Sequence, residues 1–210
     1  IYAQLLRAQS QLDFAKSNLK TAFMLGPGHA FPALQANLFL EETLASVDQK
    51  AQRNAAGIAY IAKNFSWPAG FPSHASPYTP GVILEGGELG YSLSTAFGAV
   101  LDNPNLIMAT VIGDGEAETG AIASAWHLNK LVNPVENGVV LPILHLNKYK
   151  ISGPTIFGTM SDFELIQYFH GAGWEPKIVD EYTAGDFNAE LAKAMDETFR
   201  QIAKLKFSGK

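Results

Sequence analysis

Residues 109–120 constrain the fold of this chain more than any other stretch. An apolar run rich in β-branched residues, 109–112, ends abruptly in Gly113-Asp114-Gly115, and a segment compatible with a helix, 121–131, follows. This order predicts a strand, a tight turn and a helix, with an acidic side chain at the carboxyl end of the strand. In an open α/β sheet, ligands bind at that end of the strands.

The same turn indicates a class of ligand. Its two glycines allow the backbone to approach a diphosphate, and the free N–H groups of the following helix favour negative charge. The carboxylate of Asp114 would repel a phosphate unless a cation lay between them, so the turn predicts a metal ion. The alternative is a purely structural aspartate, because Gly-Asp-Gly is a common turn sequence.

A second apolar run, residues 139–146, ends in Asn147. A short crossover connects the two runs, which predicts neighbouring parallel strands and places Asp114 and Asn147 side by side. A pair of side-chain oxygens suits Mg²⁺, which takes one or two protein oxygens and completes its shell with phosphate and water. An unrelated asparagine at a strand end remains the alternative.

Composition limits the class of protein. With 210 residues and 47% hydrophobic residues, the chain can bury one sizeable core, so we expect a single domain over residues 1–210. A net charge of −5 without a basic cluster argues against nucleic-acid binding. We expect no membrane segment and no signal peptide, and the absence of cysteine fits a cytoplasmic protein. Because the chain starts at Ile1, inside an apparent helix, we expect a piece of a longer protein.

Hydrophobic periodicity predicts four or five strands that alternate with helices. This pattern is typical of an α/β fold, a mostly parallel sheet with helices on both faces. The expected helices are 1–19, 32–44, 48–64, 91–100, 121–131, 162–170 and 187–206, and the expected strands are 21–25, 109–112, 139–146 and 175–179. Ser161 and Glu164 form a capping-box pattern. Residues 66–90 form a proline- and glycine-rich loop, which favours a functional role.

Five stretches together resemble the amino-terminal region of xylulose 5-phosphate/fructose 6-phosphate phosphoketolases, which are thiamine diphosphate enzymes. The resemblance covers residues 1–179 and fades in the last helix. The stretches are Gly-Pro-Gly-His at 26–29, Pro-Ser-His at 72–74, Glu-Gly-Gly-Glu-Leu-Gly-Tyr-Ser-Leu at 85–93, Gly-Asp-Gly-Glu-Ala-Glu-Thr-Gly at 113–120 and Leu-Pro-Ile-Leu-His-Leu-Asn at 141–147.

The resemblance implies a thiamine diphosphate-binding fold and a set of site residues. It implies that Mg²⁺ is bound by the side chains of Asp114 and Asn147 and by the carbonyl oxygen of Tyr149. It implies that His29 and His74 are catalytic, moving protons and orienting substrate hydroxyls. The implied cofactor-binding residues are Gly87 and Leu89 on the aminopyrimidine side, and Gly113, Asp114, Gly115 and Asn147 at the diphosphate and metal.

The implied reaction is cleavage of a ketose phosphate by inorganic phosphate, giving acetyl phosphate and an aldose phosphate. In the resembled enzymes the cofactor lies between domains of two subunits, so we expect a homodimer or larger assembly. Further domains are absent from this chain, which we expect to be inactive alone. Two alternatives stay open: transketolase-like ketol transfer, and a non-catalytic module that binds or assembles.

Some positions depart from the resembled pattern. Ala30 and Phe31 follow His29 where Gly-Gly is usual, Ala69 and Lys148 replace Gly, and Leu84 replaces His. We expect Phe31 to add bulk beside His29. Lys148 places a cation beside the metal loop, where it either helps to hold the diphosphate or points away.

Other polar and aromatic residues have simpler explanations. Loop histidines such as His29 and His74 are often merely solvated, and His145 is expected to be hydrogen-bonded in the core. His127 and His170 fall on predicted helices, and we expect no catalytic or binding role for them. The helix macrodipole accounts for Glu116 and Glu118, and the aromatic side chains of Trp67, Phe71 and Tyr78 are expected to pack within the loop.

Overall fold

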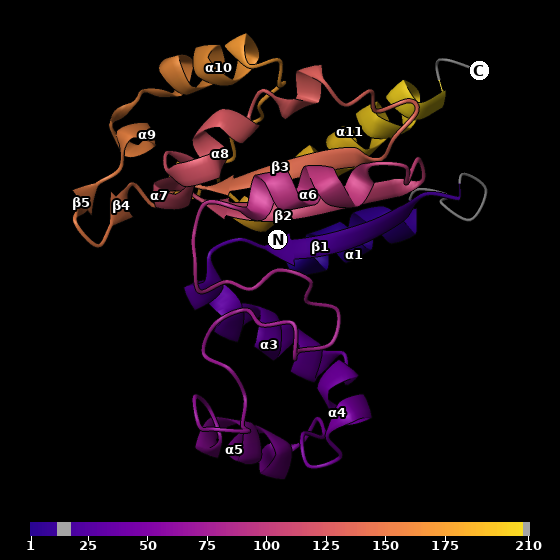
Figure 1. Ribbon diagram of the computed structural model, residues 1–210, viewed down its shortest axis with the longest axis vertical. Coiled ribbons are helices and arrows are strands. Elements are labelled where there is room, and N and C mark those ends of the chain that lie inside the picture. Colours follow the sequence, from indigo (N-terminus) through magenta and orange to yellow (C-terminus); the bar gives the residue numbers. More distant parts are fainter. Residues whose placement is uncertain (12–17, 208–210) are drawn as a thin grey trace.

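The computed structural model describes residues 1–11 and 18–207, and its centre is a parallel sheet (Figure 1). The strands are β1 (Lys20–Leu25), β2 (Leu106–Gly113) and β3 (Val139–His145), in the order β1-β2-β3. Leu25 is paired with Val111, and Gly113 with His145. The prediction that the second and third of these strands are parallel neighbours is confirmed.

Helices cover both faces of the sheet. One face is covered by α6 (Ser92–Val100), α8 (Gly120–Ala125) and α10 (Asp162–Gly171), and the other by α1 (Tyr2–Gln11) and α11 (Phe187–Phe207). Side chains alternate along β2, so Met108 and Ile112 pack on the first face, whereas Ile107 and Ala109 pack on the second. The predicted α/β architecture is therefore confirmed.

A second group of helices lies below the sheet in Figure 1. It consists of the short η1 (Gly28–Ala30), α3 (Phe31–Leu40), α4 (Thr43–Val47) and α5 (Ala55–Lys63). Their apolar side chains form a separate core with Leu25 and Val111 at the end of the sheet. The long loop 64–91 runs along these helices and contributes the buried Ala75 to their core.

Two expected helices are interrupted in this lower group. The helix predicted over 32–44 breaks because Glu42 adopts a left-handed conformation, with φ 67°. The helix predicted over 48–64 begins only at Ala55, where the side chain of Asn54 caps it by accepting a hydrogen bond from the N–H of Gly57 (2.9 Å).

The segment after β2 also differs from the single helix predicted over 121–131. It forms α7 (Asp114–Ala117), then α8, then the short η2 (Leu128–Lys130). The indole N–H of the buried Trp126 donates to the carbonyl of Ala117 (3.2 Å). This contact folds the segment back on itself, and residues far apart in sequence supply the rest of its packing.

The remaining predictions have mixed outcomes. The helix expected over 162–170 is α10, with the Ser161–Glu164 capping box formed, and the last helix is α11. Residues 175–179 are not a strand, so within the described residues the parallel sheet has three strands rather than four or five. Of the helix expected over 1–19, residues 12–17 lie outside the described residues.

A small hairpin follows β3. It pairs β4 (Tyr149–Lys150) with β5 (Gly153–Pro154) and leads into α9 (Ile156–Thr159). Across the described parts of the chain, every helix is too short or too polar to cross a membrane.

Candidate functional site at the carboxyl edge of the sheet

The carboxyl ends of the three parallel strands share one edge of the sheet. β1 leads into Gly26, β2 into Asp114, and β3 into the segment that contains Asn147. Because the strands are parallel, each of the three sequence motifs that follow them emerges at this edge. The edge therefore carries the candidate site.

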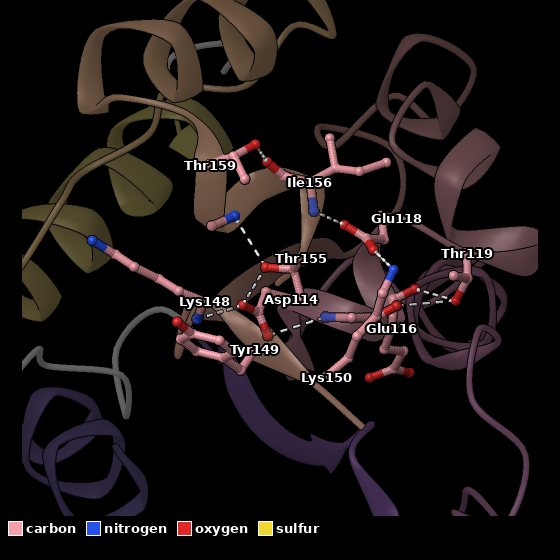
Figure 2. A network of polar contacts seen from close by, with 12 residues as sticks. Asp114, Glu116, Glu118, Thr119, Lys148, Tyr149, Lys150, Thr155, Ile156 and Thr159 are labelled. Carbon is pink, nitrogen blue, oxygen red and sulfur yellow. Dashed lines mark hydrogen bonds and ion pairs between the residues drawn. The ribbon is translucent and has the colours of Figure 1, made fainter. Parts of the chain in front are cut away.

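Asp114 lies at the centre of a polar network (Figure 2). Its side chain is buried, and Oδ2 accepts hydrogen bonds from the main-chain N–H of Lys148 (2.7 Å) and the hydroxyl of Thr155 (2.8 Å). Oδ1 accepts from the N–H of Gly115 (3.0 Å). A carboxylate offers about four acceptor positions, so these bonds orient Asp114 and still leave it able to contact a cation.

The segment after β3 lies against this carboxylate, because the N–H of Lys148 binds Asp114 directly. The side-chain oxygen of Asn147 accepts a hydrogen bond from the N–H of Tyr149 (2.9 Å), which fixes the turn between them. The available donors are a carboxylate, an amide oxygen and a carbonyl oxygen, the hard ligands that Mg²⁺ prefers. The residues present fit a magnesium ion.

Clusters of ionisable metal ligands are not found in the described part of the chain. Among residues 1–11 and 18–207, no group of three or more His, Cys, Asp or Glu side chains could hold a metal ion. A metal site built on Asp114 would therefore need amide or carbonyl oxygens among its other protein ligands.

Glu118 fastens the hairpin to α7. Its largely buried carboxylate forms an ion pair with Lys150 and accepts a hydrogen bond from the N–H of Ile156 (Figure 2). The neighbouring Thr155 was missed in the sequence, since it lies 41 residues after Asp114 and carries no local signal. The contacts of Glu118 and the hydrogen bond from Thr155 to Asp114 together hold the β4–β5 hairpin beside the candidate metal site.

The loops that carry the two candidate catalytic histidines are joined through their backbones. The carbonyl of Gly28 accepts from the N–H of Ala75 (3.2 Å), and the carbonyl of Ala75 accepts from the N–H of Gly86 (2.8 Å). His29 and His74 are each adjacent to one of these residues, and both are exposed. The structure thus brings both histidine loops together with the glycine-rich loop of residues 85–90.

Close packing of two backbone segments explains Gly28 and Gly86. A Cβ atom added to Gly28 would lie 1.9 Å from the carbonyl oxygen of Gly86, so no larger residue fits without a shift. The next residue, Gly87, donates its N–H to both carboxylate oxygens of Glu85 (3.0 Å each). Gly87 and Leu89 are exposed on the same loop.

Glu116 is a buried carboxylate that the macrodipole explanation does not account for. It is 2% exposed, and Oε1 accepts from the hydroxyl of Ser92 (2.8 Å), while Oε2 accepts from the N–H of Gly113 (3.3 Å). Burial raises its pKa above the ordinary value, opposed by hydrogen bonds from Ser92, Gly113 and Gly90 and by the charge of His29. A glutamate directly after the Gly-Asp-Gly turn was the only sequence signal for it.

Several local expectations are wrong. His145 is exposed at the end of β3 instead of buried in the core, because it lies at the edge of the sheet. Phe31 is fully buried in the core of the lower helices, whereas His29 is exposed. Trp67 and Tyr78 are 68% and 97% exposed and do not pack within the loop.

Two departures from the resembled pattern share a conformation. Ala69 and Lys148, which stand where the resembled family has glycine, have φ angles of 58° and 71°. These values lie in the left-handed region that glycine adopts most readily. The side chain of Lys148 extends away from Asp114 (Figure 2), so it does not add a cation to the proposed metal site.

Comparison with solved structures shows the fold. The chain is similar to transketolase from Campylobacter jejuni, with a TM-score of 0.61 and 19% sequence identity over 88% of this chain and 27% of the transketolase. It is also similar to transketolase from Leishmania mexicana, with a TM-score of 0.57 and 19% identity over 89% of this chain and 26% of that one. The fold is therefore the predicted thiamine diphosphate-binding fold.

Sequence comparison shows the family. Residues 3–210 match the family described as XFP N-terminal domain. The chain is 46% identical to a probable phosphoketolase of Brucella abortus over 206 residues, which cover 98% of this chain and 26% of that protein. It is 48% identical to a probable phosphoketolase of Synechococcus elongatus over 202 residues, 96% of this chain and 25% of the relative. The chain thus spans about a quarter of the length of these relatives, and it belongs to the family of amino-terminal phosphoketolase domains.

Proposed function

We propose that this chain is the part of a phosphoketolase that holds the diphosphate and metal end of thiamine diphosphate. The proposed reaction is cleavage of xylulose 5-phosphate, fructose 6-phosphate or both by inorganic phosphate, which gives acetyl phosphate and an aldose phosphate. The observation that carries the proposal is the meeting of the Asp114 turn, the segment 147–149 and both histidine loops at one edge of the sheet.

Each group at this edge has a proposed part in holding the cofactor. Asp114, the side chain of Asn147 and the carbonyl of Tyr149 would bind Mg²⁺. Gly113 and Gly115 would let the backbone approach the diphosphate. The loop that contains Gly87 and Leu89 would contact the aminopyrimidine ring. When bound, thiamine diphosphate would supply the nucleophilic carbon and the electron sink for carbon–carbon cleavage, and the protein would supply position and proton transfer.

His29 and His74 are the proposed proton-transfer residues. Their loops are joined at Gly28 and Ala75, and both side chains are exposed at the edge of the sheet. The hydroxyl oxygen of Ser73 lies 3.1 Å from Nδ1 of His74, and this contact can restrict the orientation of the imidazole ring. Histidine exchanges protons near neutral pH, which suits both deprotonation and the orientation of substrate hydroxyl groups.

The site in this chain is proposed to be completed by other parts of the enzyme. The chain spans about a quarter of its relatives, and large apolar side chains are exposed beside the site, including Leu89, Tyr91 and Ile151. We propose that the remaining domains and a second subunit cover them, in a cytoplasmic homodimer or larger assembly. The 210-residue chain alone is expected to be inactive.

The test uses the full-length product of the reading frame that encodes this chain. It is incubated with fructose 6-phosphate or xylulose 5-phosphate, inorganic phosphate, Mg²⁺ and thiamine diphosphate, and acetyl phosphate is measured. Asp114→Asn removes the proposed metal-binding charge and is expected to abolish the product. The matched variant Asp102→Asn removes an exposed carboxylate before β2, at the opposite edge, and is expected to keep it.

The outcomes separate the candidate functions. Acetyl phosphate that disappears only in Asp114→Asn supports the phosphoketolase proposal and the metal site together. Ketol transfer to an added aldose without acetyl phosphate would assign transketolase activity instead. If neither acetyl phosphate nor a ketol-transfer product forms and thiamine diphosphate does not bind, the chain is assigned as a non-catalytic module.

A further inference from the structure

The carboxylate of Glu116 lies where three separate loops of the candidate site meet. Oε1 binds the hydroxyl of Ser92 at the start of α6, and Oε2 binds the N–H of Gly113 at the end of β2. The N–H of Gly90, in the loop 85–90, favours the ionised form of this carboxylate and so lowers its pKa. One side chain therefore links the glycine-rich loop to the turn that carries Asp114.

The third loop packs against the same carboxylate. A Cβ atom added to Gly26, which opens the Gly-Pro-Gly-His loop, would lie 2.6 Å from Glu116 Oε2 and 2.6 Å from Ser92 Oγ. The backbone carbonyl oxygen of Val111 would lie 2.7 Å from the same Cβ atom, so glycine is needed at position 26 for the loop to pass this close to Glu116.

A contribution to the global stability of the fold does not explain why a carboxylate is buried at position 116. Neutral donors hold the carboxylate, and placing a charge among them out of water costs folding free energy. What the carboxylate contributes is geometry, because it accepts hydrogen bonds from donors on different segments at once. Those segments carry the groups proposed to hold the cofactor.

We propose that Glu116 is a positioning residue, whose carboxylate holds the loops of Gly26, Gly90 and Gly113 at the spacing that thiamine diphosphate requires. The inference rests on the proposed function. Glu116 itself does not touch the cofactor in this proposal. It acts through the backbone of the residues that do.

The proposal distinguishes two substitutions at this position. Glu116→Ala removes the acceptor for all donors, and we expect it to weaken thiamine diphosphate binding in the presence of Mg²⁺ about tenfold to a hundredfold. Glu116→Gln keeps one oxygen for the N–H groups of Gly90 and Gly113. Its amide group can donate to Ser92, whose hydroxyl can rotate to accept. We therefore expect Glu116→Gln to restore most of the affinity.

Ser92 provides an internal check on that geometry. In the Glu116→Gln background the amide group depends on the Ser92 hydroxyl as its acceptor. Ser92→Ala is therefore expected to cost different amounts of affinity in Glu116→Gln and in the unmodified protein. Equal losses in both backgrounds would contradict the assigned hydrogen bonds.

The first readout does not depend on the cofactor. Amide hydrogen exchange is measured on the full-length protein without Mg²⁺ or thiamine diphosphate, at Gly86, Gly90 and Gly113. Glu116→Ala is expected to speed exchange at these three amides, while residues 106–112 of strand β2 keep their protection. The matched control is Glu118→Ala, two residues away, which is expected to speed exchange at Ile156 and to leave Gly90 protected.

The second readout is the dissociation constant of thiamine diphosphate, measured by calorimetry with saturating Mg²⁺. Faster loop exchange and weaker binding in Glu116→Ala, both reversed in Glu116→Gln, support the proposal. Unchanged exchange in the loops, or loss of protection throughout the sheet, would overturn it. If the unmodified protein does not bind thiamine diphosphate, the proposed function fails, and the exchange pattern still decides whether Glu116 couples the loops.

Discussion

The hydroxyl of Thr155 donates a hydrogen bond to Oδ2 of Asp114 at 2.8 Å, although 41 residues separate them. Thr155 is fully buried. Its hydroxyl oxygen also accepts a hydrogen bond from the N–H of Gly158 (3.0 Å), and this bond caps α9. One hydroxyl thus orients the proposed metal ligand and begins a helix. Partners of this kind hold a metal-binding carboxylate in place.

Replacing Thr155 with valine tests this relationship. Thr155→Val keeps the shape and removes the hydroxyl, leaving Asp114 with one donor fewer and Gly158 without its cap. We expect the free energy of unfolding in urea to fall by roughly 1–3 kcal/mol and the apparent Mg²⁺ affinity with thiamine diphosphate to fall about tenfold. Thr155→Ser, which keeps the hydroxyl, should retain most of both. Equal stability of the valine and serine variants would contradict this assignment.

The left-handed residues Ala69 and Lys148 predict stabilising substitutions. The left-handed conformation costs a residue with a Cβ atom about 1–2 kcal/mol. Glycine avoids this strain, but it loses about 0.5–1 kcal/mol more chain entropy on folding. We therefore expect Ala69→Gly and Lys148→Gly each to raise the free energy of unfolding by about 0.5–1 kcal/mol. Ala123→Gly, on an exposed position of the helix α8, is the control and should lower it. The same sign for all three variants would rule out the strain argument.

Two glycine-to-alanine substitutions should act in opposite directions. At Gly28 the new Cβ atom would meet the backbone of Gly86, so we expect Gly28→Ala to lower the free energy of unfolding by roughly 1–3 kcal/mol. At Gly98, inside α6, nothing lies within 4 Å of an added Cβ atom, and Gly98→Ala should raise it by about 0.5–1 kcal/mol. Urea unfolding followed by circular dichroism measures both. A stabilised Gly28→Ala variant would show that the loops do not pack as described.

The capping box of α10 predicts a pH dependence. Hydrogen bonds from the main-chain N–H and the hydroxyl of Ser161 lower the pKa of Glu164 below 4.5. The folded state therefore favours the ionised form. The stability that this cap contributes is present above pH 4.5 and is lost as the pH falls through the lowered pKa.

Carboxyl NMR titration measures that pKa directly. Ser161→Ala removes the hydroxyl and keeps the main-chain donor, so the pKa of Glu164 should rise part of the way to its ordinary value. Ser124→Ala removes a hydroxyl that bonds within α8 and should leave Glu164 unchanged. An unchanged titration in Ser161→Ala would mean that the hydroxyl does not stabilise the carboxylate.

Local patterns in the sequence predicted the parts of the structure that local forces build. The apolar run before Gly113 is β2, the turn at Asp114 begins α7, and the Ser161–Glu164 pair caps α10. Strand periodicity, turn chemistry and helix capping each act over a few residues. The short crossover between two apolar runs was enough to predict that β2 and β3 are parallel neighbours.

Local patterns failed where contacts over long separations decided the outcome. Residues 175–179, expected as a strand, do not form one, and Thr155 binds Asp114 from 41 residues further along the chain. The macrodipole explanation of Glu116 used only its own helical turn, and therefore missed its burial against Ser92.

The sequence by itself determined the α/β class, the strand–turn–helix around Asp114 and the order of the motifs along the chain. Only the tertiary structure decided which groups meet at the edge of the sheet. It set Thr155 against Asp114, Gly28 against Gly86, and Glu116 among three loops. Local propensities act between near neighbours in the chain, whereas burial and hydrogen bonding select partners by distance in space, which the sequence does not record.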